Sequence, residues 1–266
     1  MFTLNIVGAI VLFTAFFIEF ALILRERPPK KLVNESMANV SLGICIILLG
    51  IVEKSISFSY FSLLYHVAIF KPAVSAWLWV VAFLGCDFFH YFYHWVGHKT
   101  RLFWAAHSTH HSSQNFNLST GWRTNFIHLF YRFLFWSPLC LLGIPPEMVL
   151  FFESVSAIQN FLVHTERVGK LGVLDWLFNT PSNHRVHHGS NPEYLDKNLG
   201  GITMIYDHLF GTYAKETVKP VYGITHNIDT ENPVTILLNE FVNLKKGFFR
   251  VKGLVTKFRY LFSRPQ

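Results

Sequence analysis

The sequence has 266 residues, of which 51% are hydrophobic, 17% aromatic and only 15% charged, and its mean hydropathy is positive. A soluble domain carries about 25% charged residues, so this composition excludes an ordinary soluble protein and indicates an integral membrane protein. The formal net charge is +7. Because long apolar runs accompany it, we expect this charge to meet anionic lipid heads and not nucleic acid.

The first apolar run, residues 4–24, is long enough to cross a bilayer. Basic residues follow this run in RERPPKK instead of preceding it. That order favours a retained membrane span over a signal peptide, and it places residues 25–36 in the cytoplasm.

Two further apolar segments lead to the first histidines. Residues 38–52 begin a second span, and the aromatic stretch 55–70 is either its continuation or a segment on the outer face. Residues 73–89 return toward the cytoplasm and run directly into a histidine-rich stretch. We therefore expect that stretch at the cytoplasmic surface.

The histidines have the spacing of metal ligands. They form one His-x-x-x-His pair and two copies of His-x-x-His-His: His94 and His98; His107, His110 and His111; His184, His187 and His188. Residues three or four apart share a helix face, so each group can aim its imidazoles at one point. Neutral imidazole suits zinc, copper, iron and nickel. Eight ligands exceed the four of a single zinc ion, which indicates two metal ions.

Four residues near these motifs are additional candidates. His164 ends an apolar run between the two clusters and is a candidate ninth ligand, while Asn160, one turn earlier, is a candidate to hold a metal-bound water. His90 lies one turn before the first pair, on the same face. Asp87 is a candidate to hydrogen-bond a ligand imidazole, and an ion pair with a nearby base is the alternative.

A third apolar hairpin follows, in which residues 126–142 run outward and 147–163 return. Its return brings the end of the run to the side that bears the first histidine motifs. The polar, glycine-punctuated residues 165–230 then predict a small cytoplasmic cap over the metals.

Within the predicted cap, TPSNHRVHHG has helix-start chemistry at Thr180 and a stop at Gly189. Asp207 is a candidate to orient a metal ligand, and Asp196 is a weaker one. The tail, residues 239–266, mixes apolar and basic residues as an amphipathic helix on an anionic membrane surface does; a solvated basic tail is the alternative. No second domain is evident, so residues 1–266 are interpreted as one domain.

The blocks FWAAHSTHHSSQNFNLST and NTPSNHRVHHGSNPEYLDKN, followed by FGT and VYGITH, resemble the fatty acid hydroxylase/sterol desaturase superfamily of membrane di-iron enzymes. The likeness covers about residues 87–226 and is closest to the alkylglycerol monooxygenase branch. It implies an all-α membrane protein with about four to five transmembrane helices and a cytosolic cap. It also implies two iron ions held by the eight motif histidines together with His164.

The sequence departs from that branch in two ways. Lys99 stands where the ether-lipid enzymes have an acidic residue, so that role is not carried over. Those enzymes also have further membrane helices after the catalytic part, and here the chain ends soon after YGITH.

The function predicted from these features is activation of O2 at two irons, with hydroxylation or desaturation of a lipid C–H bond. The substrate would be a fatty acyl chain, a sterol or an alkylglycerol ether lipid, and the catalytic machinery would consist of the metal ligands. Two electrons must come from outside, from a ferredoxin, a cytochrome b5-like protein or tetrahydrobiopterin, because G-x-G-x-x-G is absent. The alternatives are a zinc-dependent membrane hydrolase with Glu166 or Glu193 as base, and a metal transporter or sensor. Zinc can also replace iron in purified protein.

Overall fold

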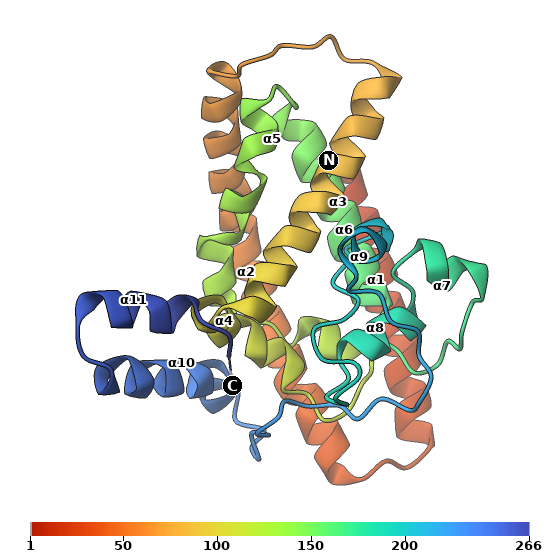
Figure 1. Ribbon diagram of the computed structural model, residues 1–266. Coiled ribbons are helices and arrows are strands. Elements are labelled where there is room, and N and C mark those ends of the chain that lie inside the picture. The colour runs from red at the N-terminus through yellow and green to blue at the C-terminus, as the bar shows by residue number, and fades with distance from the viewer. Residues whose placement is uncertain (1, 266) are drawn as a thin grey trace.

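The computed structural model describes residues 2–265, and within them the regular secondary structure is helical apart from two isolated β-bridges. Three of the described helices are long and apolar enough to cross a membrane: α1 (Phe2–Arg25), α2 (Lys30–His66) and α3 (Ala76–Lys99). They run up and down past one another (Figure 1). The predicted all-α membrane fold is confirmed.

The apolar segment 38–52 and residues 55–66 of the aromatic segment belong to one helix, α2, which answers the question that the sequence left open. A helix of 37 residues is about 55 Å long, whereas the hydrocarbon core is about 30 Å thick. The excess length lets the first turns of α2, which bury Glu35 and Asn39, contact the polar part of the protein.

The third apolar hairpin differs from the expected pair of long helices. Its first arm consists of η2 (Phe126–Phe130), η3 (Arg132–Trp136) and the short α5 (Ser137–Leu141), and only the return forms a longer helix, α6 (Pro146–Leu162). The physical reason is an internal polar contact: the Arg132 guanidinium binds the Glu53 carboxylate of α2 at 3.1 Å. This arm therefore packs inside the bundle.

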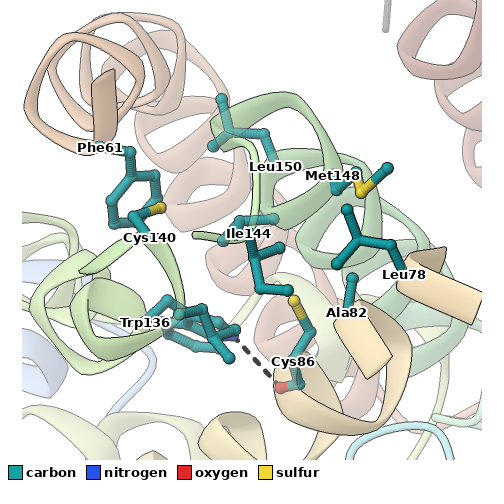
Figure 2. Close-up of a cluster of buried hydrophobic side chains, with 11 residues drawn as sticks. Phe61, Leu78, Ala82, Cys86, Trp136, Cys140, Ile144, Met148 and Leu150 are labelled. Atoms are coloured by element: carbon teal, nitrogen blue, oxygen red, sulfur yellow. Dashed lines mark hydrogen bonds between the residues drawn. The ribbon is translucent and has the colours of Figure 1, made fainter. Parts of the chain in front are cut away.

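An apolar cluster joins this hairpin to α2 and α3 (Figure 2). Phe61 of α2, Cys86 of α3 and Trp136 of η3 are all buried in it. The Trp136 indole Nε1 also donates a hydrogen bond to the Cys86 carbonyl at 3.2 Å. The cluster fixes α3 against α6, the two helices that lead to His94 and His164.

The polar part of the protein is built from short elements: α4 (Arg101–His111), η1 (Leu118–Trp122), α7 (Val173–Leu177), α8 (Pro181–His187) and α9 (Ile205–Phe210). From here on, "the cap" means residues 165–230. The predicted start of α8 is confirmed. Its N-cap is Thr180, the residue before Pro181, and the Thr180 side chain accepts a hydrogen bond from a backbone N–H of the first turn.

Two buried carboxylates of the long helices bind the polar segments. Glu35 of α2 accepts a hydrogen bond from the Gln114 backbone N–H at 2.9 Å. Glu19 of α1 accepts one from the Leu118 N–H at 2.6 Å and another from the Thr165 hydroxyl. An unpaired carboxylate would be costly in this apolar bundle, and these contacts supply the required donors.

The C-terminal residues form two helices, α10 (Pro233–Arg250) and α11 (Leu254–Phe262), which lie crosswise to the long helices (Figure 1). The Asn125 amide donates to the Leu237 carbonyl at 2.9 Å, and the Arg101 N–H donates to the Ser263 carbonyl at 2.9 Å. The tail is therefore docked at both ends of α4.

Candidate metal centre

Nine histidine side chains converge in two sets, and in each set one ring nitrogen of every histidine lies within 4.8 Å of the others. All nine predicted ligands belong to a set. The first set consists of His94, His98, His107, His111 and His187; the second consists of His110, His164, His184 and His188.

Each His-x-x-His-His motif is divided between the two sets. In α4, His107 and His111 belong to the first set and His110 to the second. Residues four apart differ by about 40° around a helix, whereas residues three apart lie about 60° to the other side. The i, i+4 pair therefore faces one metal position and the remaining histidine faces the other. The expectation that each motif points at one centre was wrong, and α4 and α8 each serve both sets.

The Nε2 atoms face inward. His94 Nε2 lies 3.0 Å from His107 Nε2, which lies 3.2 Å from His111 Nε2. In the second set, His184 Nε2 lies 2.9 Å from His164 Nε2. Neutral imidazole nitrogens at this separation either share one proton or coordinate one cation.

Two further Nε2 atoms of the first set, those of His98 and His187, are buried with no hydrogen-bond partner among the described residues. A buried nitrogen with an unused lone pair is costly, and a bound cation would remove that cost. The donor set is thus suited to metal ions that accept neutral nitrogen ligands.

The opposite ring nitrogens are held by backbone carbonyls. His94 Nδ1 donates to the Leu199 carbonyl at 2.9 Å, and His187 Nδ1 donates to the Lys197 carbonyl at 3.0 Å. The same contact recurs in the second set, from His110 to Arg123 and from His164 to Asn160. A proton held on Nδ1 leaves the Nε2 lone pair free for a metal and fixes the ring orientation.

The charge state of the histidines also suits metal binding. Burial, reinforced by the neighbouring histidines, lowers the pKa well below the usual histidine value at His107, His111, His164, His184, His187 and His188. Neutral imidazole is the form that binds metals, so these ligands need no deprotonation at neutral pH.

One carboxylate lies beside the first set. Asp196 Oδ1 is 3.4 Å from His98 Nδ1, and Oδ2 binds the Lys99 ammonium. Burial alone would raise the pKa of Asp196, but the hydrogen bonds from His98 and Lys99 outweigh it and hold that pKa well below its usual range. Lys99 therefore contacts the set only through Asp196, the residue that the sequence ranked as the weaker candidate.

The structure places two of the predicted neighbours outside the sets. His90 belongs to neither set, and its Nδ1 lies 3.2 Å from the Ser156 hydroxyl. Asp87 was predicted to hydrogen-bond a ligand imidazole, but its carboxylate binds backbone N–H groups instead. Its oxygens accept hydrogen bonds from the Ile202 N–H at 2.7 Å and the Thr203 N–H at 3.2 Å. Asp87 therefore anchors the loop before α9, since backbone N–H groups of that loop donate to its carboxylate.

Asn160 and Asp207 act through the backbone. The Asn160 carbonyl accepts the hydrogen bond of His164, while its side-chain amide donates within α6. Asp207 Oδ1 accepts a hydrogen bond from the Leu199 N–H at 2.8 Å, and the Leu199 carbonyl receives His94. Asp207 is thus linked through Leu199 to His94, a candidate ligand.

Sequence reasoning missed Arg123, whose side chain is almost fully buried. Its guanidinium donates to the Thr109 carbonyl, to the Ser112 hydroxyl and to Asn39 of α2, and its carbonyl receives His110. A single arginine outside any motif gives no spacing signal, so only its burial identifies it.

A cavity of about 1000 Å³ opens beside the second set, between the α1–α2 turn and the cap. Phe116 separates the two: its ring stacks on that of Tyr222 at 4.9 Å and lies 5.2 Å from the ring of His188. The Tyr222 hydroxyl donates to Glu166 at 3.0 Å, which fixes the outer ring of the pair.

The fold and the two histidine sets define a membrane-embedded helical protein with a candidate dinuclear metal centre. Residues 79–212 match the family model described as fatty acid hydroxylase, which spans half of the chain and all nine histidines. The chain therefore belongs to the fatty acid hydroxylase family, and the predicted family resemblance is confirmed.

Curated relatives agree with this assignment. The chain is 36% identical to an alkylglycerol monooxygenase of Homo sapiens over 95% of this chain and 58% of the relative. It is 36% identical to that of Danio rerio, over 91% and 54%, and 32% identical to an ornithine lipid hydroxylase of Rhizobium tropici, over 50% and 41%. The chain thus spans about half the length of the curated relatives it matches. No solved structure matches it.

Proposed function

We propose that the protein is a membrane-bound di-iron oxygenase that uses O2 to hydroxylate a C–H bond of a lipid. The observation that supports this most strongly is the presence of two buried, adjacent, all-histidine sets whose Nε2 atoms converge. Membership of the fatty acid hydroxylase family and likeness to lipid-modifying monooxygenases and hydroxylases support the same reaction class.

The number of ligands in the first set favours iron over zinc. Zinc takes four ligands in a tetrahedron. The first set has five histidine nitrogens, one more than a tetrahedral zinc site holds.

A hydrolase would also need a carboxylate base beside its metal. Both sets consist of histidines alone, the Glu166 carboxylate accepts the Tyr222 hydroxyl, and Glu193 is exposed on the cap. The carboxylate beside the first set, Asp196, is held by His98 and Lys99. A transporter would place its ligands on broken helices at the membrane midplane. Here the α3 ligands occupy its last two turns, in a helix with no break.

When bound, two iron ions would supply the O2 activation and the oxidising power that this reaction requires. The protein's own contribution is orientation and exclusion of water. The backbone carbonyls bound to Nδ1 hold the rings, and seven of the nine side chains are buried. Nine neutral ligands leave the charge of the ions uncompensated, apart from Asp196 beside the first set.

The overall reaction is R–H + O2 + 2e⁻ + 2H⁺ → R–OH + H2O, so a lipid and two electrons must both reach the centre. The positive residues between α1 and α2 favour a cytoplasmic position for that turn, and α3 ends on the same side of the bundle (Figure 1). We therefore propose a cytoplasm-facing centre that receives the lipid from the bilayer. Its electrons would come from a ferredoxin, a cytochrome b5-like protein or tetrahydrobiopterin.

Metal content and product analysis test this function. Protein purified without oxygen from iron-57-fed cells should contain about two irons per chain, magnetically coupled in the Mössbauer spectrum after oxidation. Lipids from cells that express the protein under ¹⁸O2 should gain one labelled hydroxyl. One tightly held zinc and no iron would refute the oxygenase assignment.

Three alanine variants give the matched controls. His187→Ala should lose the iron of the first set and His110→Ala that of the second, because each removes one converging ligand. Both should abolish product formation while the protein stays in the membrane. His226→Ala, at an exposed histidine outside both sets, should keep both irons and full activity.

A further inference from the structure

Two short helices of the cap turn large apolar side chains outward. On and beside α7 and α9, five of these side chains are between two-fifths and three-quarters exposed: Val173 71%, Trp176 53%, Phe178 41%, Leu209 68% and Phe210 53%. We call these five residues the α7–α9 patch. A soluble cap would bury such side chains, since each gains about 1.5–3 kcal/mol on leaving water.

The patch is a single ordered surface. The Met204 N–H donates to the Leu177 carbonyl at 3.0 Å, and His208 Nε2 donates to the Trp176 carbonyl at 2.9 Å. The rings of Trp176 and His208 also pack at 4.8 Å. Backbone and ring contacts therefore hold α7 beside α9, and their apolar faces are presented together.

The patch continues the lipid-facing side of a membrane helix. The Tyr206 hydroxyl of α9 donates to the Leu84 carbonyl of α3 at 2.8 Å. Tyr206 packs on Phe88 with ring centroids 5.3 Å apart, and Phe210 stacks on Tyr91 at 5.4 Å. Leu84 lies about 20 Å along α3 from the end of that helix, so α9 is docked well within the length of a membrane span.

The outer face of α3 is apolar from Leu84 toward the start of the helix. Trp77, Val80, Val81 and Leu84 are all exposed on it. The carboxylates near the patch are occupied: Asp207 is buried, and Asp175 accepts hydrogen bonds from the Leu171 N–H and from Thr180. The patch therefore adds no free carboxylate to the apolar face that it continues.

We propose that the α7–α9 patch inserts into the boundary between the head groups and acyl chains of the bilayer, so that the cap contacts lipid directly. Bilayer lipid is the occupant because the patch is continuous with the outer face of α3, which faces the membrane. The basic helices α10 and α11 lie on the opposite side of the protein in the view of Figure 1. The cap would thus be supported by lipid on its own side.

The inserted helix is connected to the first histidine set. Asp207 of α9 binds the Leu199 N–H, and the Leu199 carbonyl holds His94. Two consecutive contacts therefore separate a lipid-exposed helix from a candidate metal ligand. This surface assignment does not depend on the reaction catalysed, so it stands or falls separately from the proposed function.

The first test measures the depth of a fluorescent label in nanodiscs of phosphatidylcholine with one-quarter phosphatidylglycerol. Leu209→Cys is labelled with NBD in a background in which Cys45, Cys86 and Cys140 are replaced by alanine. Glu193→Cys, at an exposed position of the same cap, is the matched control. The Leu209 label should emit at shorter wavelength and be quenched by lipid carrying a doxyl group near the head group. The Glu193 label should be quenched by iodide instead.

A second measurement keeps all three native cysteines. In nanodiscs of brominated lipid, the wild-type protein should lose more tryptophan emission than Trp176→Phe, because the exposed Trp176 would then be in contact with bromine. Greater quenching of the wild type supports insertion. Equal quenching of both proteins, or iodide quenching at Leu209 as strong as at Glu193, would overturn the proposal.

Discussion

Asp196→Asn should weaken metal binding in the first histidine set and leave the second set loaded. The carboxylate touches one ligand of the first set, at 3.4 Å from His98 Nδ1, and His98 does not belong to the second set. An amide keeps the shape but removes the negative charge that favours a proton on His98 Nδ1 and thereby strengthens Nε2 as a donor. The expected result is a change from about two irons per chain to about one.

The size of this effect follows from the geometry. Loss of a hydrogen-bond partner behind a metal ligand typically costs 10–100-fold in metal affinity. Asp196 supports one of five ligands, at a distance that is long for a hydrogen bond, and its side chain is 32% exposed. We therefore expect the lower end of that range, about tenfold or 1.4 kcal/mol.

The assay is retention of iron during stepwise dialysis against a chelator, with Lys99→Met as the matched control. Lys99 binds the other carboxylate oxygen and does not touch a histidine, so its removal should leave iron retention unchanged. Equal losses in the two variants would show that the ion pair matters and not the imidazole contact. Unchanged retention in Asp196→Asn would refute the reasoning.

Three other predictions concern stability, measured by thermal unfolding in detergent. Arg123→Met should cost about 3 kcal/mol, because three buried acceptors lose their donor; a loss below 1 kcal/mol would contradict this. Gly43→Ala should destabilise the protein, since its Cβ would lie 2.7 Å from Trp122, whereas Gly50→Ala in the same helix meets no atom and should not. Burial raises the pKa of Asp207 from 3.8 to about 6. The free energy of unfolding of the wild type, relative to that of Asp207→Asn, should therefore be highest below pH 4. It should fall by about 3 kcal/mol as the pH rises through 6, because the folded protein then loses the proton that it holds more tightly than the unfolded chain does. A difference independent of pH would show that the Asp207 pKa is not raised.

Much of the fold follows from the sequence because hydropathy and helix period are local properties. Residues 4–24 lie in α1, and residues 76–89 of the segment 73–89 lie in α3. The stretch 126–142 has the apolarity of a span but forms short turns, because Arg132 reaches Glu53 of α2. That pairing joins residues far apart in the chain, so no local pattern reveals it.

The candidate site shows the same limit. Histidine spacing predicted the eight motif ligands that belong to the sets, since i, i+3 and i, i+4 neighbours must lie near one face, whereas His164 was predicted from its place between the motifs. Spacing did not predict that His110 separates from His107, because that depends on where the second set lies. Nor did spacing predict that the carbonyls of Leu199 and Lys197 accept hydrogen bonds from the histidines. Every residue has a carbonyl, so the sequence alone does not show which ones the fold brings to the imidazoles.

The division of α8 between both sets has a consequence for biosynthesis. Both sets take histidines from α8, the last contributing helix to be made. Before α8 docks, the first set holds four ring nitrogens, the number that zinc prefers, and only the arrival of His187 makes it five. We therefore expect metal selectivity to be set late in synthesis, so that rapid docking of α8 protects the nascent chain from taking up the wrong ion.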